Sequence, residues 1–414
     1  MGNAAADLLH RGFGALPFIF LGNNYQDEPL RVHFLGESFS HPPFRLGQAF
    51  QTNARISDLE TLAEEVYDAW SKFSVRLAAS SSEDELTTIL RAALRASYEY
   101  TKLIFNFNSA NLFVPFCEWA LGGSEPVIVQ NPGVSVPWHL LYCSPTAPGA
   151  ANIEDEARFL LGLQRPVVFQ IVLAEASRPE SGDVATDLLF SVGGNLPGFN
   201  SLNDAVLQVE GKLKQVFPEA TRKRLHTFSD HDRHFSKSQL DHDVWFVVSH
   251  GVESTERFHQ RTIALEGPGH LDGKKFKQFS RERGARGTFT RAASVLLLAC
   301  RSGIAGGKWD LPQEILTFGA ASVIAPHADV SLRKSLELAD IYLRKVKEEG
   351  VLPSFAFIEA QRSIENIFDR CHANLFTPMF SDEKGLTKHW LRKQSVPSET
   401  SGESVATAQA SPSS

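Results

Sequence analysis

A histidine and a cysteine each stand at the end of a short, continuous apolar run. His250 follows the run that begins at Val244, and Cys300 follows the run that begins at Ser294. Apolar runs of this length are typical of buried strands. A thiol at neutral pH is mostly protonated, so it needs a nearby base before it can attack a carbonyl carbon. The two residues therefore predict cysteine-nucleophile chemistry, with His250 as the base.

The glycine after the histidine adds a second element of this chemistry. Gly251 allows the backbone to approach a substrate closely, and its N–H can donate to a developing oxyanion. Together with the N–H of Cys300 it forms a predicted two-donor oxyanion hole. A cysteine that ends an apolar strand is often only an inert core residue, because free cysteine is among the most buried residue types. The pairing of Cys300 with His250 favours the catalytic interpretation over the structural one.

A sheet is needed to bring the two strand tips together. Short apolar runs alternate with helical patterns, which predicts crossover connections, a mainly parallel sheet and a three-layer α/β/α sandwich. Open sheets of this class keep their sites at strand tips. The predicted strands are 127–130, 167–174, 188–192, 244–249, 295–299 and 321–325, and the predicted helices are 202–216, 313–318, 332–347 and 354–367.

Upstream of this pattern the sequence predicts a helical hairpin. Apolar residues recur at helical spacing over 56–79 and 83–103, and the serines between them supply a turn and an N-cap. A strand is predicted over 30–35, while the spacing assigns no role to the rest of residues 1–55. The chain after residue 393 has almost no large apolar side chains, so we expect a disordered tail.

Composition limits the classes of protein to which the chain could belong. Of its 414 residues, 43% are hydrophobic and 21% are charged, as in soluble globular enzymes. The net charge of -7 argues against direct nucleic-acid binding, which needs an excess of lysine and arginine. No apolar run reaches the roughly 20 residues of a membrane span. The four cysteines show no CxxC pairing, so we expect a reducing, cytoplasmic location with no metal and no cofactor.

One group of histidines invites a metal interpretation. These residues lack the fixed helix-face spacing of histidine-rich zinc sites, so a polar, solvated connection is the favoured prediction. The group comprises His226, His231, His234 and His242, with Asp230 and Asp232 among them.

Four stretches of the chain are similar to the CHAT-domain peptidases, the caspase- and separase-related cysteine peptidases. They are VPWHLLY (136–142), SHG (249–251), LACRSG (298–303) and FGAASVIA (318–325), with a weaker match over 356–361. The separation of 50 residues between His250 and Cys300 agrees with the caspase arrangement, and Ala299, Cys300 and Arg301 match its QACRG pattern.

This resemblance implies a caspase-like fold and a role for each residue of the site. His250 is expected to be the base and proton donor, Cys300 the nucleophile, and Gly251 a donor in the oxyanion hole. The family works as a dyad, so no third residue is needed to orient the histidine. Where relatives have a tryptophan-containing turn, this chain has Asp329. Asp329 either lines an S1 pocket that favours arginine or lysine, or N-caps the helix that begins near Ser331.

The resemblance also implies a division of the chain and a function. We expect an N-terminal region with the hairpin over 1–110, a caspase-like peptidase domain over 111–390, and the tail over 391–414. The expected function is a bacterial endopeptidase of signalling or defence that cuts a protein substrate. An activating protein or ligand in trans, or processing of the chain, is expected to control it. The alternative is a non-catalytic caspase-like interaction module.

Overall fold

The computed structural model describes most of the chain between residues 16 and 380. The described residues are 16–22, 28–36, 39, 43–44, 48–79, 81–130, 136–149, 152–170, 187–193, 221–235, 244–253, 261–265, 269–281, 294–303, 311–349 and 353–380, with a few single positions between 204 and 218. Most of the predicted helix over 202–216 lies outside these residues. His242, the end of the predicted strand over 167–174 and the whole tail over 391–414 also lie outside them.

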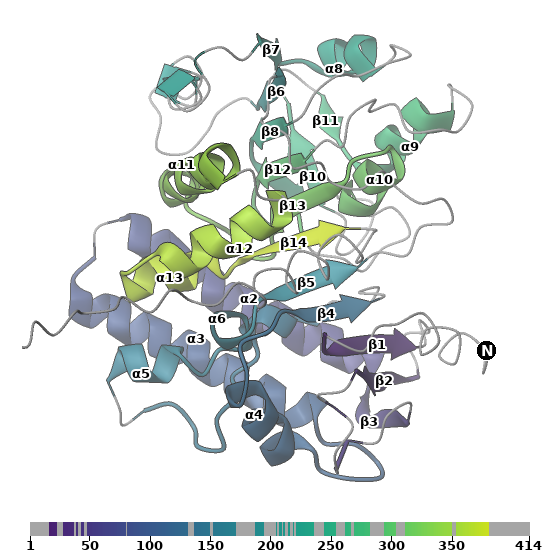
Figure 1. The fold of residues 1–414 in the computed structure, drawn as a ribbon, viewed down its shortest axis with the longest axis vertical. Coiled ribbons are helices and arrows are strands. Elements are labelled where there is room, and N and C mark those ends of the chain that lie inside the picture. Colours follow the sequence, from purple (N-terminus) through teal and green to yellow (C-terminus); the bar gives the residue numbers. More distant parts are fainter. Residues whose placement is uncertain are drawn as a thin grey trace, which may run out of the picture.

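In the described part of the chain, eleven strands form one large sheet in the order β3-β2-β1-β4-β5-β14-β13-β12-β8-β6-β7 (Figure 1). Of the ten neighbouring pairs within the described strands, seven are parallel. This confirms the prediction of a mainly parallel sheet. The strands are β1 (Phe18–Gly22), β2 (Pro29–Leu35), β3 (Ala49–Arg55), β4 (Val127–Gln130), β5 (Val167–Gln170), β6 (Asp187–Val192), β7 (Thr221–Leu225), β8 (Val244–Val248), β12 (Ser294–Leu298), β13 (Ser322–Pro326) and β14 (Phe376–Phe380).

Helices cover both faces of this sheet, which confirms the predicted sandwich. Trp245 of β8 packs against the rings of Phe235 and Phe276, with centroids 4.9 and 5.5 Å away. On the opposite face, Ser294 of β12 contacts the hydroxyl of Tyr342 at 3.1 Å. The helices here are α8 (Phe228–Phe235), α9 (Gly273–Arg281), α10 (Leu311–Thr317), α11 (Leu332–Glu349), α12 (Pro353–Ser363) and α13 (Ile367–Ala373). Because both faces are covered, β8 is apolar throughout and β12 is apolar after Ser294, rather than alternating.

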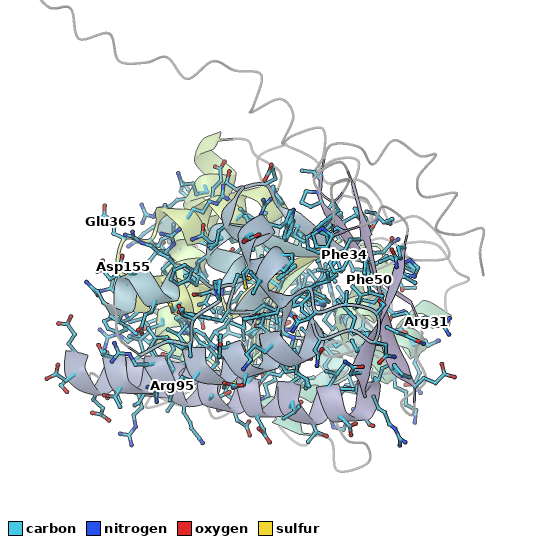
Figure 2. The ribbon with its side chains drawn as sticks, turned by 90° about the horizontal axis from the view of Figure 1, so that it is seen from below. Arg31, Phe34, Phe50, Arg95, Asp155 and Glu365 are labelled. Atoms are coloured by element: carbon cyan, nitrogen blue, oxygen red, sulfur yellow. The ribbon has the colours of Figure 1, made fainter. Side chains whose placement is uncertain are left out.

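The predicted helical hairpin is confirmed. It consists of α2 (Ile56–Ala78) and α3 (Glu83–Ile104), and Ser82 caps α3 by accepting a hydrogen bond from the N–H of Glu85. Trp70 of α2 donates its indole N–H to Ser97 of α3 at 2.9 Å, which fixes the two helices together. Figure 2 shows the pair lying side by side as a layer along one side of the molecule.

The three strands before the hairpin extend the large sheet. β1 pairs with β4 in parallel and with β2 in antiparallel fashion, so the sheet runs unbroken across residue 110. Phenylalanine side chains join these strands to the hairpin. The rings of Phe34 and Phe50 lie 5.7 Å apart (Figure 2), and Phe34 also stacks on Phe105 at the end of α3.

Several short elements were not predicted. β7 lies at the edge of the sheet and is built from basic residues, while β14 contains Pro378, so neither has the apolar run of a buried strand. A second, small sheet contains β9 (Gly251–Glu253), β10 (Arg261–Ala264) and β11 (His270–Leu271). The remaining short helices are α4 (Phe113–Leu121), η2 (Trp138–Leu140), α5 (Ile153–Ala157) and α6 (Leu161–Gln164).

Candidate functional site

The structure places the two strand tips side by side. β8 and β12 are neighbouring parallel strands, with Val248 opposite Leu298. The N–H of Ser249 donates to the carbonyl of Leu298 at 3.2 Å, so the pairing continues one residue past β8. His250 and Cys300 therefore both follow the C-terminal ends of these neighbouring strands, and each is partly exposed.

Gly251 packs directly against the backbone of Cys300. A Cβ atom at this position would lie only 1.8 Å from the carbonyl oxygen of Cys300, so no side chain can be accommodated. Gly251 begins β9, opposite Ile263 of β10. The N–H of Ala264 donates to the backbone carbonyl of His250 at 2.9 Å, so His250 occupies a hydrogen-bonded position of this antiparallel ladder. Antiparallel positions alternate, so the N–H of Gly251 points away from β10.

Cys300 differs from the other three cysteines in its exposure. Cys117, Cys143 and Cys371 are buried, whereas Cys300 is partly exposed. Its thiol donates a long hydrogen bond, 3.8 Å from Sγ to the carbonyl oxygen of Val330. In the part of the chain that the structure describes, no hydrogen bond joins this thiol to His250.

The surroundings of Cys300 raise the pKa of its thiol. Burial raises the pKa of Cys300, the hydrogen bond to Val330 lowers it, and the nearby carboxylate of Asp329 raises it. The guanidinium of Arg301 has a smaller, lowering effect, and the net shift of the pKa is upward. A base is therefore required to generate the thiolate in this arrangement.

Asp329 lies in the loop between β13 and α11, close to the cysteine. Its N–H donates to Ser71 of α2 at 2.8 Å, and its carboxylate pairs with Arg301 at 3.4 Å. The predicted N-cap role for Asp329 is wrong, because Ser331 accepts the hydrogen bond from the N–H of Lys334 in the first turn of α11. The reason is position, since α11 begins at Leu332, one residue beyond the serine.

A pocket of about 710 Å³ adjoins Asp329 on the side of the hairpin. Asp68 and Arg301 line it together with Asp329, and the rest of its wall is made of apolar and polar side chains of α2 and α3, including the basic Lys72 and Arg76. The side chain of Asp329 is 42% exposed and that of Asp68 is 57% exposed, so both carboxylates are accessible. A group bound in this pocket would meet two carboxylates together with the cations of Arg301, Lys72 and Arg76.

Sequence reasoning missed the role of Arg301 and of the helix that it contacts. The guanidinium of Arg301 pairs with Glu64 and Asp68 of α2, more than 230 residues earlier in the chain. The available signal was a polar stripe on α2, because Glu64, Asp68 and Ser71 recur at helical spacing within an otherwise amphipathic pattern.

The histidine group lies partly in the core. His231 and His234 are buried on α8, so the prediction of a solvated connection is wrong for them. Nδ1 of His231 lies 2.8 Å from the carbonyl oxygen of Thr227, and Nε2 lies 2.8 Å from the hydroxyl of Ser191. Both ring nitrogens therefore have hydrogen-bond partners within the protein. The described residues include no group of three or more histidine, cysteine or acidic side chains suited to a metal ion. The same residues include no helix long and apolar enough to cross a membrane.

Comparison with known proteins yields only distant structural likenesses. No protein-family model matches the sequence, and no curated protein matches it significantly. The Arg-specific cysteine proteinase gingipain R shares 12% identity over 66% of this chain and 67% of its own, with a TM-score of 0.41. Saccharomyces cerevisiae separase, solved with securin, shares 10% identity over 91% of this chain, with a TM-score of 0.48. This chain covers 30% of the length of that separase chain. At these values the comparisons assign the protein to no family.

Proposed function

We propose that this protein is a caspase-like cysteine endopeptidase, similar to the CHAT-domain peptidases, that hydrolyses a protein substrate with His250 and Cys300. The strongest support is the parallel pairing of β8 with β12, because both residues then follow the C-terminal ends of adjacent strands. The packing of Gly251 against the Cys300 carbonyl is a second support, because it brings the backbone of residue 251 next to that of Cys300.

The proposed reaction has two stages. His250 takes the proton of Cys300, and the thiolate attacks the peptide carbonyl carbon while the N–H groups of Gly251 and Cys300 stabilise the oxyanion. The amine leaves with the proton from His250, and a thioester remains. Water, deprotonated by His250, then hydrolyses this thioester and restores the thiol. Before the first stage, the thiol has to turn from the Val330 carbonyl toward the imidazole.

The pocket beside the nucleophile suggests a substrate preference. The carboxylates of Asp329 and Asp68 both pair with Arg301, yet they keep exposed surface that would form charge-assisted hydrogen bonds with a basic side chain. We therefore propose arginine or lysine as the P1 residue, with Asp329 as the specificity group. An activating protein or ligand in trans, in a cytoplasmic bacterial signalling or defence system, remains part of this proposal.

Alkylation and cleavage assays test the peptidase proposal. Iodoacetamide should label Cys300 before the three buried cysteines, and His250→Ala should slow that labelling at neutral pH. Digestion of a peptide library should show cleavage after basic residues, lost in Cys300→Ala and in His250→Ala. Cleavage that persists in Cys300→Ala, or equal labelling of all four cysteines, would refute the proposed role of Cys300.

One observation favours a second candidate, a non-catalytic interaction module. The thiol of Cys300 bonds to a backbone carbonyl and its pKa is raised, as in a structural cysteine. For such a module, the labelling rate of Cys300 would be the same in the wild type and in His250→Ala, and no peptide of the library would be cut.

A further inference from the structure

One face of α2 contacts the side chain of Arg301 and the backbone of the loop after β13, both next to the proposed nucleophile. Glu64, Asp68, Ser71 and Ser74 are spaced by four, three and three residues, so they form a single stripe along the helix. The four side chains bind two different segments. Glu64 and Asp68 reach the turn after β12, while Ser71 and Ser74 reach the loop after β13.

The first contact of the stripe holds Arg301. This residue has a φ of 53°, which lies in the left-handed region that favours glycine. Its side chain is only 9% exposed, with its guanidinium 2.9 Å from the carboxylate of Glu64 and also paired with Asp68 and Asp329. Burial alone would lower the pKa of Arg301, but Asp329, Asp68 and Glu64 together raise it. A charged, buried side chain and a left-handed backbone conformation therefore coincide at the residue directly after Cys300.

The second contact of the stripe anchors the loop that carries the Val330 carbonyl, the hydrogen-bond acceptor of the Cys300 thiol. Ser71 accepts from the N–H of Asp329 at 2.8 Å, and Ser74 accepts from the N–H of Ser331 at 3.0 Å. Val330 lies between these two anchored residues, and its carbonyl accepts the hydrogen bond from Cys300. The two segments are also bonded to each other, because the N–H of Arg301 donates to Ala328 at 3.1 Å.

We propose that Arg301 is a positioning residue for Cys300 and that it acts through Glu64 and Asp68 of α2. The hairpin is then part of the site, since it determines where the sulfur lies and which charges surround it. The inference takes the nucleophilic role of Cys300 from the proposed function. Its effect on the thiol can be measured without any substrate.

Arg301→Gln is the first test of this role. The variant removes a cation near the thiol and leaves the carboxylate of Asp329 without its partner. We expect the rate of Cys300 alkylation by iodoacetamide at pH 7.5 to fall about tenfold, and its pH profile to move to higher pH. Arg301→Lys keeps the charge and should recover part of the rate. Arg344→Gln, which removes an arginine from the Asp340 pair on α11, is the matched control and should leave the profile unchanged.

Glu64→Gln separates positioning from simple electrostatics, and it serves also if Arg301→Gln does not fold. Removing a carboxylate that acts only through its charge would lower the pKa of the thiol and speed alkylation. Removing one that holds Arg301 should slow alkylation instead, by about threefold. The control is Glu65→Gln, at an exposed neighbouring position on the same helix.

The double variant Glu64→Gln, Arg301→Gln completes a double-mutant cycle, which measures whether the two residues act independently. If the two residues act as one unit, the double variant should be no slower than Arg301→Gln alone. Additive effects, faster alkylation in Glu64→Gln, or a wild-type profile in both Arg301 variants would each overturn the proposal. An Arg301-dependent thiol profile, together with a Cys300 labelling rate that His250→Ala leaves unchanged, would refute the peptidase function and leave the positioning role intact.

Discussion

At the scale of single residues, the site depends on how closely Gly251 and Cys300 approach. The carbonyl of Cys300 occupies the space that a side chain at position 251 would need. This contact explains the glycine after the histidine in steric terms, whether or not its N–H binds an oxyanion. It also means that the position of the sulfur is sensitive to a single methyl group at a neighbouring strand.

Gly251→Ala is predicted to disable the proposed reaction. The new Cβ would displace the Cys300 backbone, and a shift of about 1 Å at a nucleophile costs on the order of 100-fold in rate. We expect kcat/KM on a cleaved peptide to fall by at least about that factor. Gly211→Ala, where a Cβ meets nothing within 4 Å, is the control. Full activity in Gly251→Ala would contradict the close approach itself.

At the scale of elements, α2 is the helix of the hairpin that contacts the loop after β13. Ser74 serves two buried groups at once, because its hydroxyl lies 3.0 Å from the N–H of Ser331 and 3.0 Å from Nδ1 of His372 on α13. The ring of Phe73 packs on Phe368 of the same helix. Polar and apolar contacts of α2 therefore reach the site and the C-terminal helices together.

Ser74→Ala should destabilise the fold measurably. Its removal leaves a buried N–H without an acceptor, which costs about 1–3 kcal/mol. Urea denaturation should show this loss in the free energy of unfolding. Thr61→Ala, at an exposed position of the same helix, should change it by less than about 0.5 kcal/mol. Equal stability of the two variants would show that the Ser74 contacts contribute nothing.

At the scale of the whole molecule, one sheet runs from the N-terminal strands to the strands of the site. Because β1 pairs with β4, the phenylalanine cluster around Phe34 belongs to the same sheet as Cys300. Phe34→Ala should cost about 3–5 kcal/mol. We expect one shifted urea transition, seen equally by circular dichroism and by Cys300 labelling. Val114→Ala, at an exposed site on α4, is the control, and two separate transitions would contradict a single cooperative sheet.

Buried histidines make the stability of the whole molecule pH-dependent. Burial lowers the pKa of His327 and of His372 to about 3 and that of His231 to about 4, and it lowers the pKa of His139 as well. Their unfolded pKa is 6.5, so below that value the unfolded state binds more protons. The stability they provide is complete above about pH 6.5 and is lost as the pH falls toward 3.

Denaturation at several pH values measures this loss. Each such histidine should remove roughly 1.4 kcal/mol per pH unit below about 6.5. His327→Gln should therefore flatten the pH dependence between pH 6 and pH 5 by about one proton. Thr61→Ala, at an exposed position without a titratable side chain, is the control and should leave the slope as it is. An unchanged slope in His327→Gln would mean that this ring is already protonated in the native protein.

The sequence by itself determined the class of the fold and the two strand tips. The apolar runs before His250 and Cys300, and the helical spacing of the hairpin, are local patterns that need no knowledge of distant contacts. The parallel arrangement followed from the alternation of these runs with helices. The roles of His250, Gly251 and Cys300 stay predictions, because strand pairing establishes their neighbourhood and not their reactivity.

Only the tertiary structure decided which charges surround the cysteine. Arg301 and Glu64 are 237 residues apart, and no local pattern in either segment indicates that they meet. The same is true of the pairing of β1 with β4, because the whole hairpin separates these strands in the sequence. It is also true of β14, because Pro378 interrupts its apolar residues and the strand cannot be predicted from an apolar run. Periodicity reports which face of an element is buried, whereas the partner of that face depends on the path of the whole chain.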